Sequence, residues 1–218
     1  MNYEVKDDVA VLGFDDGKAN AVGHDLLDAL DGGLDRAEAE AKTVLIVGRE
    51  GMLSAGFDLK EMTKGPDAAA ALVDKGARTL LKLFSHPQPV VMACTGHAIA
   101  AGAFLLLCAD SRIGGAGEFK IGLNETAIGM TIPVFGQELA RCRLNPRHLT
   151  RAFVQAHLYD PDASVDAGFL DRVLPMDQVV EQAFNEAVRL RDIAGEAYAG
   201  NKRNIRAAHI AAIEASLG

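Results

Sequence analysis

The chain has 218 residues, of which 49% are hydrophobic and 24% charged. This length and composition fit one folded domain with a sizeable core rather than a disordered chain. Its 22 Lys and Arg residues against 30 Asp and Glu residues give a formal net charge of −8, which argues against nucleic acid or an anionic membrane as a partner.

Strand-like runs alternate with helical stretches over the first half of the chain. Strands are expected at residues 5–14, around Asp7 and Asp8, and at residues 43–47 and 90–93. Helices are expected at residues 25–41 and 66–85, and from about Ala100 onward. This order predicts an α/β fold in which parallel strands are stacked in successive turns.

The second half of the chain is mostly helical. Short strands are expected at residues 111–113 and 119–121, and helices at residues 134–141, 146–157, 177–192 and 196–216. The last helix carries Lys202, Arg203 and Arg206, which we interpret as a solvated face rather than a phosphate contact. Because no linker is visible, residues 1–218 form one predicted domain, with an α/β core at 1–145 and a helical part at 146–218.

Residues 90–109 form an apolar run without Asp, Glu, Lys or Arg, and about twenty apolar residues can span a bilayer. The run is bounded by Pro89 and Asp110, has glycines and polar residues near its middle, and lacks a basic cluster at either end. We therefore predict a buried strand, a tight turn and a buried helix, with no membrane partner.

The cysteines and the N-terminus favour a cytoplasmic protein. Cys94, Cys108 and Cys142 have no metal-ligand spacing, and an odd number does not suit a disulfide framework. Residues 1–6 contain Glu4 and Lys6 where a secretory signal would lead into an apolar stretch. The motifs of phosphate-binding loops, dinucleotide sites and zinc proteases are absent, and the six histidines do not cluster, so no metal site is predicted.

Two strand-to-helix transitions could each expose one backbone N–H group. Residues 54–62 (SAGFDLKEM) follow one strand, and residues 95–102 (TGHAIAAG) follow another. N–H groups in the first turn of a helix lack partners within the helix and attract negative charge, so two such turns could hold an oxyanion. Taken alone, the first segment is more typical of a helix start at which Asp58 is the capping residue.

Four segments occur in a specific order: residues 17–22 (GKANAV), 54–62, 95–114 and 119–133. In this order they resemble the crotonase superfamily, the enoyl-CoA hydratases and isomerases, from about Val9 to Lys202. The resemblance implies the crotonase (ClpP-like) fold, with stacked ββα turns followed by C-terminal helices. It also implies a homotrimer or a hexamer built as a dimer of trimers, although 218 residues is short for a crotonase.

The resemblance assigns a site for an acyl-CoA thioester. The backbone N–H groups of Phe57 and Ala101 match the two donors that hold the thioester oxygen. The CoA adenine is expected against Ala55, Phe57 and Leu59, and the CoA phosphates near Lys18. CoA would be part of the substrate, so no separate cofactor is expected.

Hydratases of this family use two glutamates, because adding water requires one group to activate the water and another to handle the proton. At the first position this chain has Phe104, which cannot exchange protons. The second position matches Glu125, with Glu118 as the next candidate. One carboxylate is enough to move a double bond, so we predict isomerisation of 3-enoyl-CoA to 2-enoyl-CoA with Glu125 as the single acid and base.

Three alternatives stay open at this point. The chain could be an enoyl-CoA hydratase despite Phe104, or a non-catalytic acyl-CoA binder in which Phe104 fills the acyl end of the site. A serine hydrolase built on Ser54 is the third, although GMLSAG is not the nucleophile-elbow motif. Decarboxylation and thioester hydrolysis, two other reactions of this family, also require a stabilised oxyanion or enolate. The resemblance therefore leaves them open as well.

Overall fold

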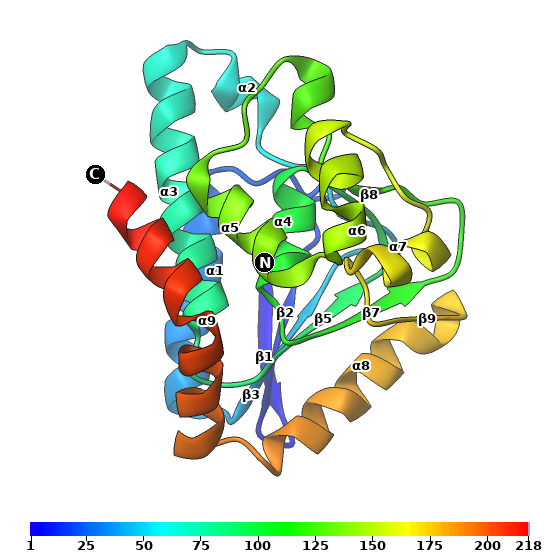
Figure 1. Cartoon of the computed structure of the whole chain (residues 1–218). Coiled ribbons are helices and arrows are strands. Elements are labelled where there is room, and N and C mark those ends of the chain that lie inside the picture. Colours follow the sequence, from blue (N-terminus) through cyan, green and yellow to red (C-terminus); the bar gives the residue numbers. More distant parts are fainter. Residues whose placement is uncertain (218) are drawn as a thin grey trace.

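A computed structural model describes residues 1–217, and it consists of two sheets enclosed by helices (Figure 1). The larger sheet has the strand order β1-β2-β3-β5-β7-β9, and the smaller has β4-β6-β8. The larger sheet contains β1 (Asn2–Lys6), β2 (Val9–Gly13), β3 (Thr43–Val47), β5 (Val90–Cys94), β7 (Ser111–Gly115) and β9 (Arg172–Leu174). The smaller contains β4 (Gly51–Ser54), β6 (Gly96–Ile99) and β8 (Ile121–Gly122).

Each turn of the fold contributes one strand to each sheet. The pairs β3 and β4, β5 and β6, and β7 and β8 follow one another along the chain, and all pairings except β1 with β2 are parallel. Asp7 and Asp8, which join β1 to β2, have φ values of 52° and 59°, as a tight antiparallel hairpin requires. The predicted α/β fold of stacked parallel turns is therefore confirmed.

Along the chain, α1 to α7 lie between strands, and α8 and α9 follow the last strand. The helices are α1 (His24–Glu40), α2 (Leu59–Met62), α3 (Pro66–Ser85), α4 (Ala101–Cys108), α5 (Val134–Arg143), α6 (Pro146–Leu149), α7 (Pro161–Ala167), α8 (Met176–Arg191) and α9 (Glu196–Ser216). A 3-10 turn, η1 (Glu125–Ile128), and a π turn, η2 (Thr150–Val154), complete the chain.

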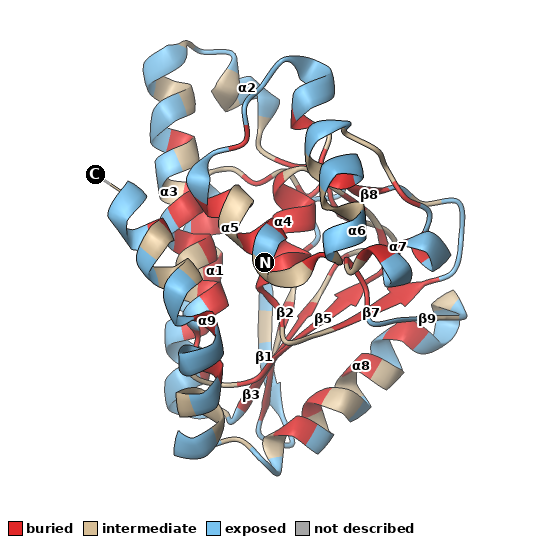
Figure 2. Cartoon of the chain, in the orientation of Figure 1, coloured by how far each residue is buried: buried red, intermediate tan, exposed pale blue. Residues whose placement is uncertain are grey.

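Helices cover both faces of the larger sheet, so its central strands are buried on both sides (Figure 2). Along β3, Val44 and Ile46 belong to the main core shared with α1, α3 and α4, whereas Leu45 contacts the second core under α8. Val91 and Ala93 of β5 alternate with Val90 and Met92 in the same way. This alternation follows the two-residue period of a strand.

The uncharged run forms three elements rather than the expected two. It begins with β5, continues without a long turn into β6, and ends in α4, whose eight residues are all buried. In the described part of the chain, no helix is both long and apolar enough to cross a bilayer. Other differences are smaller: the helix expected at residues 146–157 is divided into α6 and η2, and α7, β4 and β9 were not predicted.

The prediction of a solvated face at Lys202, Arg203 and Arg206 was wrong for two of the three residues. Lys202 is 8% exposed and Arg206 3% exposed, and both bind the carboxylate of Asp110. Only Arg203 is exposed. Helix α9 packs against α3 and α5 of its own chain, so these two cations face the interior.

Candidate active site

The turn that contains Phe57 is held by the backbone of Val22. The Val22 N–H donates to the Gly56 carbonyl at 2.8 Å, and the Asp58 N–H donates to the Val22 carbonyl at 3.1 Å. In extended chain, successive N–H groups point to opposite sides, so the Phe57 N–H points away from Val22. No hydrogen-bond acceptor for it is found within residues 1–217.

The second turn lies between β6 and α4. The Ala100 N–H donates to the Gly122 carbonyl at 3.0 Å, and Ala100 adopts φ 53° and ψ −121° before the helix begins at Ala101. The Ala100 carbonyl accepts from the N–H groups of Ala103 and Phe104. The Ala101 N–H, at the first position of α4, has no acceptor in the described part of the chain and is left free by the geometry of a helix start.

Small residues let the two turns pack together. A Cβ atom on Gly56 would lie 3.0 Å from the Ala100 Cβ and 3.6 Å from the Ala101 nitrogen. A Cβ atom on Gly102 would lie 2.3 Å from the Ser54 carbonyl oxygen, closer than real side chains come. The structure therefore brings the two proposed N–H donors into neighbouring turns, an arrangement suited to binding one carbonyl oxygen as it becomes negative.

Glu125 begins the 3-10 turn η1 and is 7% exposed. It is the only Asp or Glu side chain in the buried class among residues 1–217. One carboxylate oxygen, Oε2, is enclosed and has no hydrogen-bond partner within that range. Burial raises the pKa of Glu125 from 4.5 to about 6, opposed in part by backbone N–H groups.

The chain brings Glu125 toward the second turn through β8. The Gly122 carbonyl accepts the Ala100 N–H, and Glu125 follows three residues later. The Glu125 carbonyl also accepts the Met130 N–H at 2.9 Å, which closes the turn. A carboxyl with a raised pKa and an unpartnered oxygen has the properties of a general base.

Phe104, three residues after Ala101, belongs to the main hydrophobic core. It is 1% exposed and packs edge-on against Phe135, with ring centroids 5.4 Å apart. A Cβ atom on Gly136 would lie 2.5 Å from its ring, so the fit is close. At the position where the family resemblance puts the first glutamate of hydratases, the chain has this buried aromatic ring.

A cleft of about 470 Å³ opens beside the Phe57 turn. All four residues expected near the adenine and phosphates of CoA line it: Lys18, Ala55, Phe57 and Leu59. Leu59 is 71% exposed, which leaves an apolar side chain available to a flat ring. Ala101, Phe104 and Glu125 do not line this cleft.

Lys60 also lines the cleft and was missed by sequence reasoning. Its N–H donates to Asp58, which caps α2 as the alternative reading of this segment predicted. The cleft therefore carries two lysines, Lys18 and Lys60, and two carboxylates, Asp16 and Asp58. The signal that could have identified Lys60 is its position two residues after the helix cap, on the exposed start of α2.

Two other candidates have different surroundings. The Ser54 side chain is buried and its Oγ accepts the Gly56 N–H at 3.2 Å, so it stabilises the turn. No imidazole is hydrogen-bonded to Ser54 among the described residues, as a serine hydrolase would need. Glu118 is exposed, unlike Glu125.

Comparisons with known proteins agree with this geometry. The family model described as "Enoyl-CoA hydratase/isomerase" matches residues 4–216. A crystal structure of an enoyl-CoA hydratase/isomerase family protein from Pseudomonas syringae is 42% identical, with a TM-score of 0.96, and the match covers 99% of this chain and 94% of that chain. The expected crotonase fold is therefore confirmed.

Two curated relatives have different names. Mouse "Enoyl-CoA delta isomerase 1, mitochondrial" is 33% identical over 135 residues, covering 61% of this chain and 47% of the mouse protein. A "Probable enoyl-CoA hydratase" of Bacillus subtilis is 34% identical over 131 residues, covering 58% of this chain and 50% of that protein. The chain thus spans about half the length of these relatives, and their names divide between two reactions.

Proposed function

Because the chain belongs to the enoyl-CoA hydratase/isomerase family, we propose that it isomerises 3-enoyl-CoA thioesters to 2-enoyl-CoA thioesters. The observation that carries this proposal is the enclosed carboxyl of Glu125, which has an unpartnered oxygen, combined with Phe104 where the family resemblance puts the first glutamate of hydratases. Isomerisation removes one proton and returns one proton, so one acid and base is enough.

The proposed reaction has two proton transfers. The Glu125 carboxylate removes a proton from carbon 2 of the substrate, and the electron pair of that C–H bond moves toward the thioester. The N–H groups of Phe57 and Ala101 hold the thioester oxygen while it carries negative charge. Protonated Glu125 then returns the proton to carbon 4, which leaves the double bond between carbons 2 and 3.

The remaining site residues bind the substrate. The exposed cleft lined by Ala55, Phe57 and Leu59 is proposed to take the CoA adenine. Lys18 and Lys60 are proposed to contact its phosphates, since a flexible ammonium group suits a phosphate as a point charge. Phe104 and Phe135 exclude water from the reacting carbons, which disfavours hydration.

The assembly, location and pathway are also proposals. The family resemblance supports a homotrimer or a hexamer made from two trimers. We propose that the enzyme acts in the cytoplasm, in fatty acid metabolism, and needs no metal or cofactor other than the CoA of its substrate.

The deciding experiment compares Glu125→Gln with the wild-type enzyme on 3-enoyl-CoA and 2-enoyl-CoA esters. We expect kcat for isomerisation to fall by about 10²–10⁴-fold in the variant, because an amide cannot accept the proton. Mass spectrometry of the products separates the reactions, since hydration adds one water and isomerisation adds nothing. Retention of full isomerase activity by Glu125→Gln would reject the proposal.

A second variant tests the role of Phe104 and the alternative functions. Phe104→Glu adds a carboxyl at the position where hydratases have one, so hydration of 2-enoyl-CoA is expected to increase. Wild-type protein that hydrates 2-enoyl-CoA and does not isomerise 3-enoyl-CoA would be a hydratase. Tight binding of the thioesters without any turnover would identify a non-catalytic binder.

A further inference from the structure

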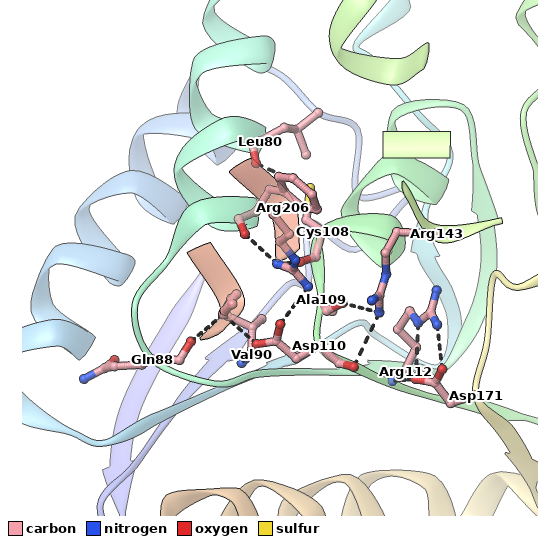
Figure 3. A network of polar contacts seen from close by, with 12 residues as sticks. Leu80, Gln88, Val90, Cys108, Ala109, Asp110, Arg112, Arg143, Asp171 and Arg206 are labelled. Atoms are coloured by element: carbon pink, nitrogen blue, oxygen red, sulfur yellow. Dashed lines mark hydrogen bonds and ion pairs between the residues drawn. The ribbon is translucent and has the colours of Figure 1, made fainter. Parts of the chain in front are cut away.

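A buried ion cluster lies at the end of α4 opposite the proposed catalytic turn (Figure 3). Its centre is Asp110, whose carboxylate accepts the Val90 N–H at 2.8 Å. The same carboxylate binds Lys202 at 2.6 Å and Arg206 at 2.7 Å, both from α9. Asp110 therefore joins the first residue of β5 to the C-terminal helix.

A third cation, Arg143 at the end of α5, enters the same cluster. Its Nη2 group donates to the carbonyls of Ala109 and Asp110, at 2.8 and 3.4 Å. Its Nε is enclosed and has no hydrogen-bond partner within residues 1–217. Among the described residues, Arg143 is thus held by carbonyl oxygens and has no carboxylate partner.

The cluster has more positive than negative charge. Lys202, Arg206 and Arg143 surround the single carboxylate of Asp110, in a protein whose net charge is −8. Arg112, which is nearby, is already paired with Asp171 at 2.5 Å. Burial lowers the pKa of Lys202 to about 8; Asp110 opposes this shift, and Arg206 and Arg143 add to it.

The surface over the cluster is hollowed. A depression of about 380 Å³ is lined by the three cations and Asp110, with Tyr198 and the exposed Asn201 among the other lining residues. The Asn201 amide can donate hydrogen bonds, whereas the Tyr198 hydroxyl is already hydrogen-bonded to Asp110. The carbonyls of Cys108 and Ala109, at the negative end of α4, already accept hydrogen bonds from Arg206 and Arg143 respectively.

We propose that this depression binds a small oxyanion, a phosphate or a carboxylate group, between Arg143 and Asn201. The anion would supply a charged partner for Arg143, since Lys202 and Arg206 are already paired with Asp110. Guanidinium groups favour both phosphate and carboxylate as partners. The site is separate from the CoA cleft, with which it shares no lining residue.

The test uses two variants of α9 that add the same charge. Asn201→Asp places a carboxylate in the depression, whereas Asn204→Asp places one on an exposed residue of the same helix that does not line it. Inorganic phosphate and acetate are titrated separately at constant ionic strength, with binding followed by calorimetry and by the shift in melting temperature. The two titrations show which oxyanion the site prefers.

We expect saturable binding of at least one of the two anions to wild-type protein and to Asn204→Asp, and at least about tenfold weaker binding to Asn201→Asp. Saturating the CoA cleft with CoA should leave this binding unchanged. Two results would overturn the proposal: no saturable binding of either anion to the wild type, or equal binding to both variants. Competition by CoA would place the anion in the CoA cleft and would also overturn it.

Discussion

The carboxyl of Glu125 is costly to ionise, because it is nearly enclosed and only its backbone surroundings favour the charge. Its pKa of about 6 still leaves the group deprotonated near neutral pH. A base whose pKa lies just below the working pH combines the correct protonation state with good proton affinity. The burial that destabilises the carboxylate therefore suits it to the proposed chemistry.

The pH dependence of the rate follows from this pKa. The base must be deprotonated, so kcat/KM for 3-enoyl-CoA should rise tenfold per pH unit below about pH 6 and level off above it. The measurement is the initial rate at low substrate concentration between pH 5 and 8. A profile that is flat over this range would exclude Glu125 as the base.

At the residue scale, the sequence grouped residues of one short segment that line a common cleft, but it missed contacts with distant partners. The cleft residues Ala55, Phe57 and Leu59 were placed by one short segment. Lys202 and Arg206 were misread because their partner, Asp110, lies 92 and 96 positions away in the chain. A local charge pattern contains no information about such a pairing.

At the scale of elements, the turn before α4 is strained. Ala100 has φ 53° and ψ −121°, a conformation that glycine adopts freely and alanine does not. Its Cβ atom also faces Gly56 across the proposed oxyanion site. The strain is therefore located where the second N–H donor is positioned.

Replacing Ala100 by Gly should relieve this strain. We expect the variant to be more stable by about 1 kcal/mol after the entropy cost of glycine in the unfolded chain. Thermal unfolding is the measurement, and Ala103→Gly is the control, because the same change inside α4 should be destabilising. A lower melting temperature for Ala100→Gly would contradict the strain argument.

The docking of α9 depends on Asp110. Asp110→Asn leaves Lys202 and Arg206 buried without their carboxylate, so the free energy of unfolding should fall by about 3–5 kcal/mol. Urea unfolding measures the loss. Asp74→Asn, which removes one partner of the exposed Arg78–Asp74 pair, serves as the control and should cost less than about 1 kcal/mol. Equal losses in the two variants would show that burial adds nothing to the Asp110 pairs.

Elements with strong local patterns were predicted closely. Residues 43–47 and 66–85 coincide with β3 and α3, because a run of β-branched residues and a proline-initiated helix are local signals. The strands β4, β6 and β9 have three or four residues each, and β4 and β6 begin with glycine. Such strands exist through pairing with distant segments, which no local pattern reveals.

At the scale of the whole molecule, several apolar side chains are left uncovered around η1 and η2. Ile128, Met130 and Val154 are 57%, 38% and 58% exposed. The two segments are joined by the Thr126 hydroxyl, which donates to the Phe153 carbonyl at 3.3 Å. Exposed apolar groups that are gathered in one region are typical of an interaction surface.

This surface supports the expected oligomer. We predict a species of about 69 kDa, three times the 23.1 kDa of one chain, or twice that mass, in sedimentation velocity. Val154→Asp should shift the protein toward smaller species, because it adds a charge to the apolar region. A wild-type protein that sediments as a monomer would contradict the prediction.

The lone carboxylate of Glu125 also has a stereochemical consequence. A group fixed in one turn can reach only one side of a bound substrate, so in the proposed isomerisation the proton should leave carbon 2 and enter carbon 4 on the same face of the dienolate. Because Glu125 is only 7% exposed, its proton exchanges slowly with bulk water relative to an open site. Deuterium placed at carbon 2 would then be carried in part to carbon 4, and the retained fraction would report how well the closed site excludes solvent.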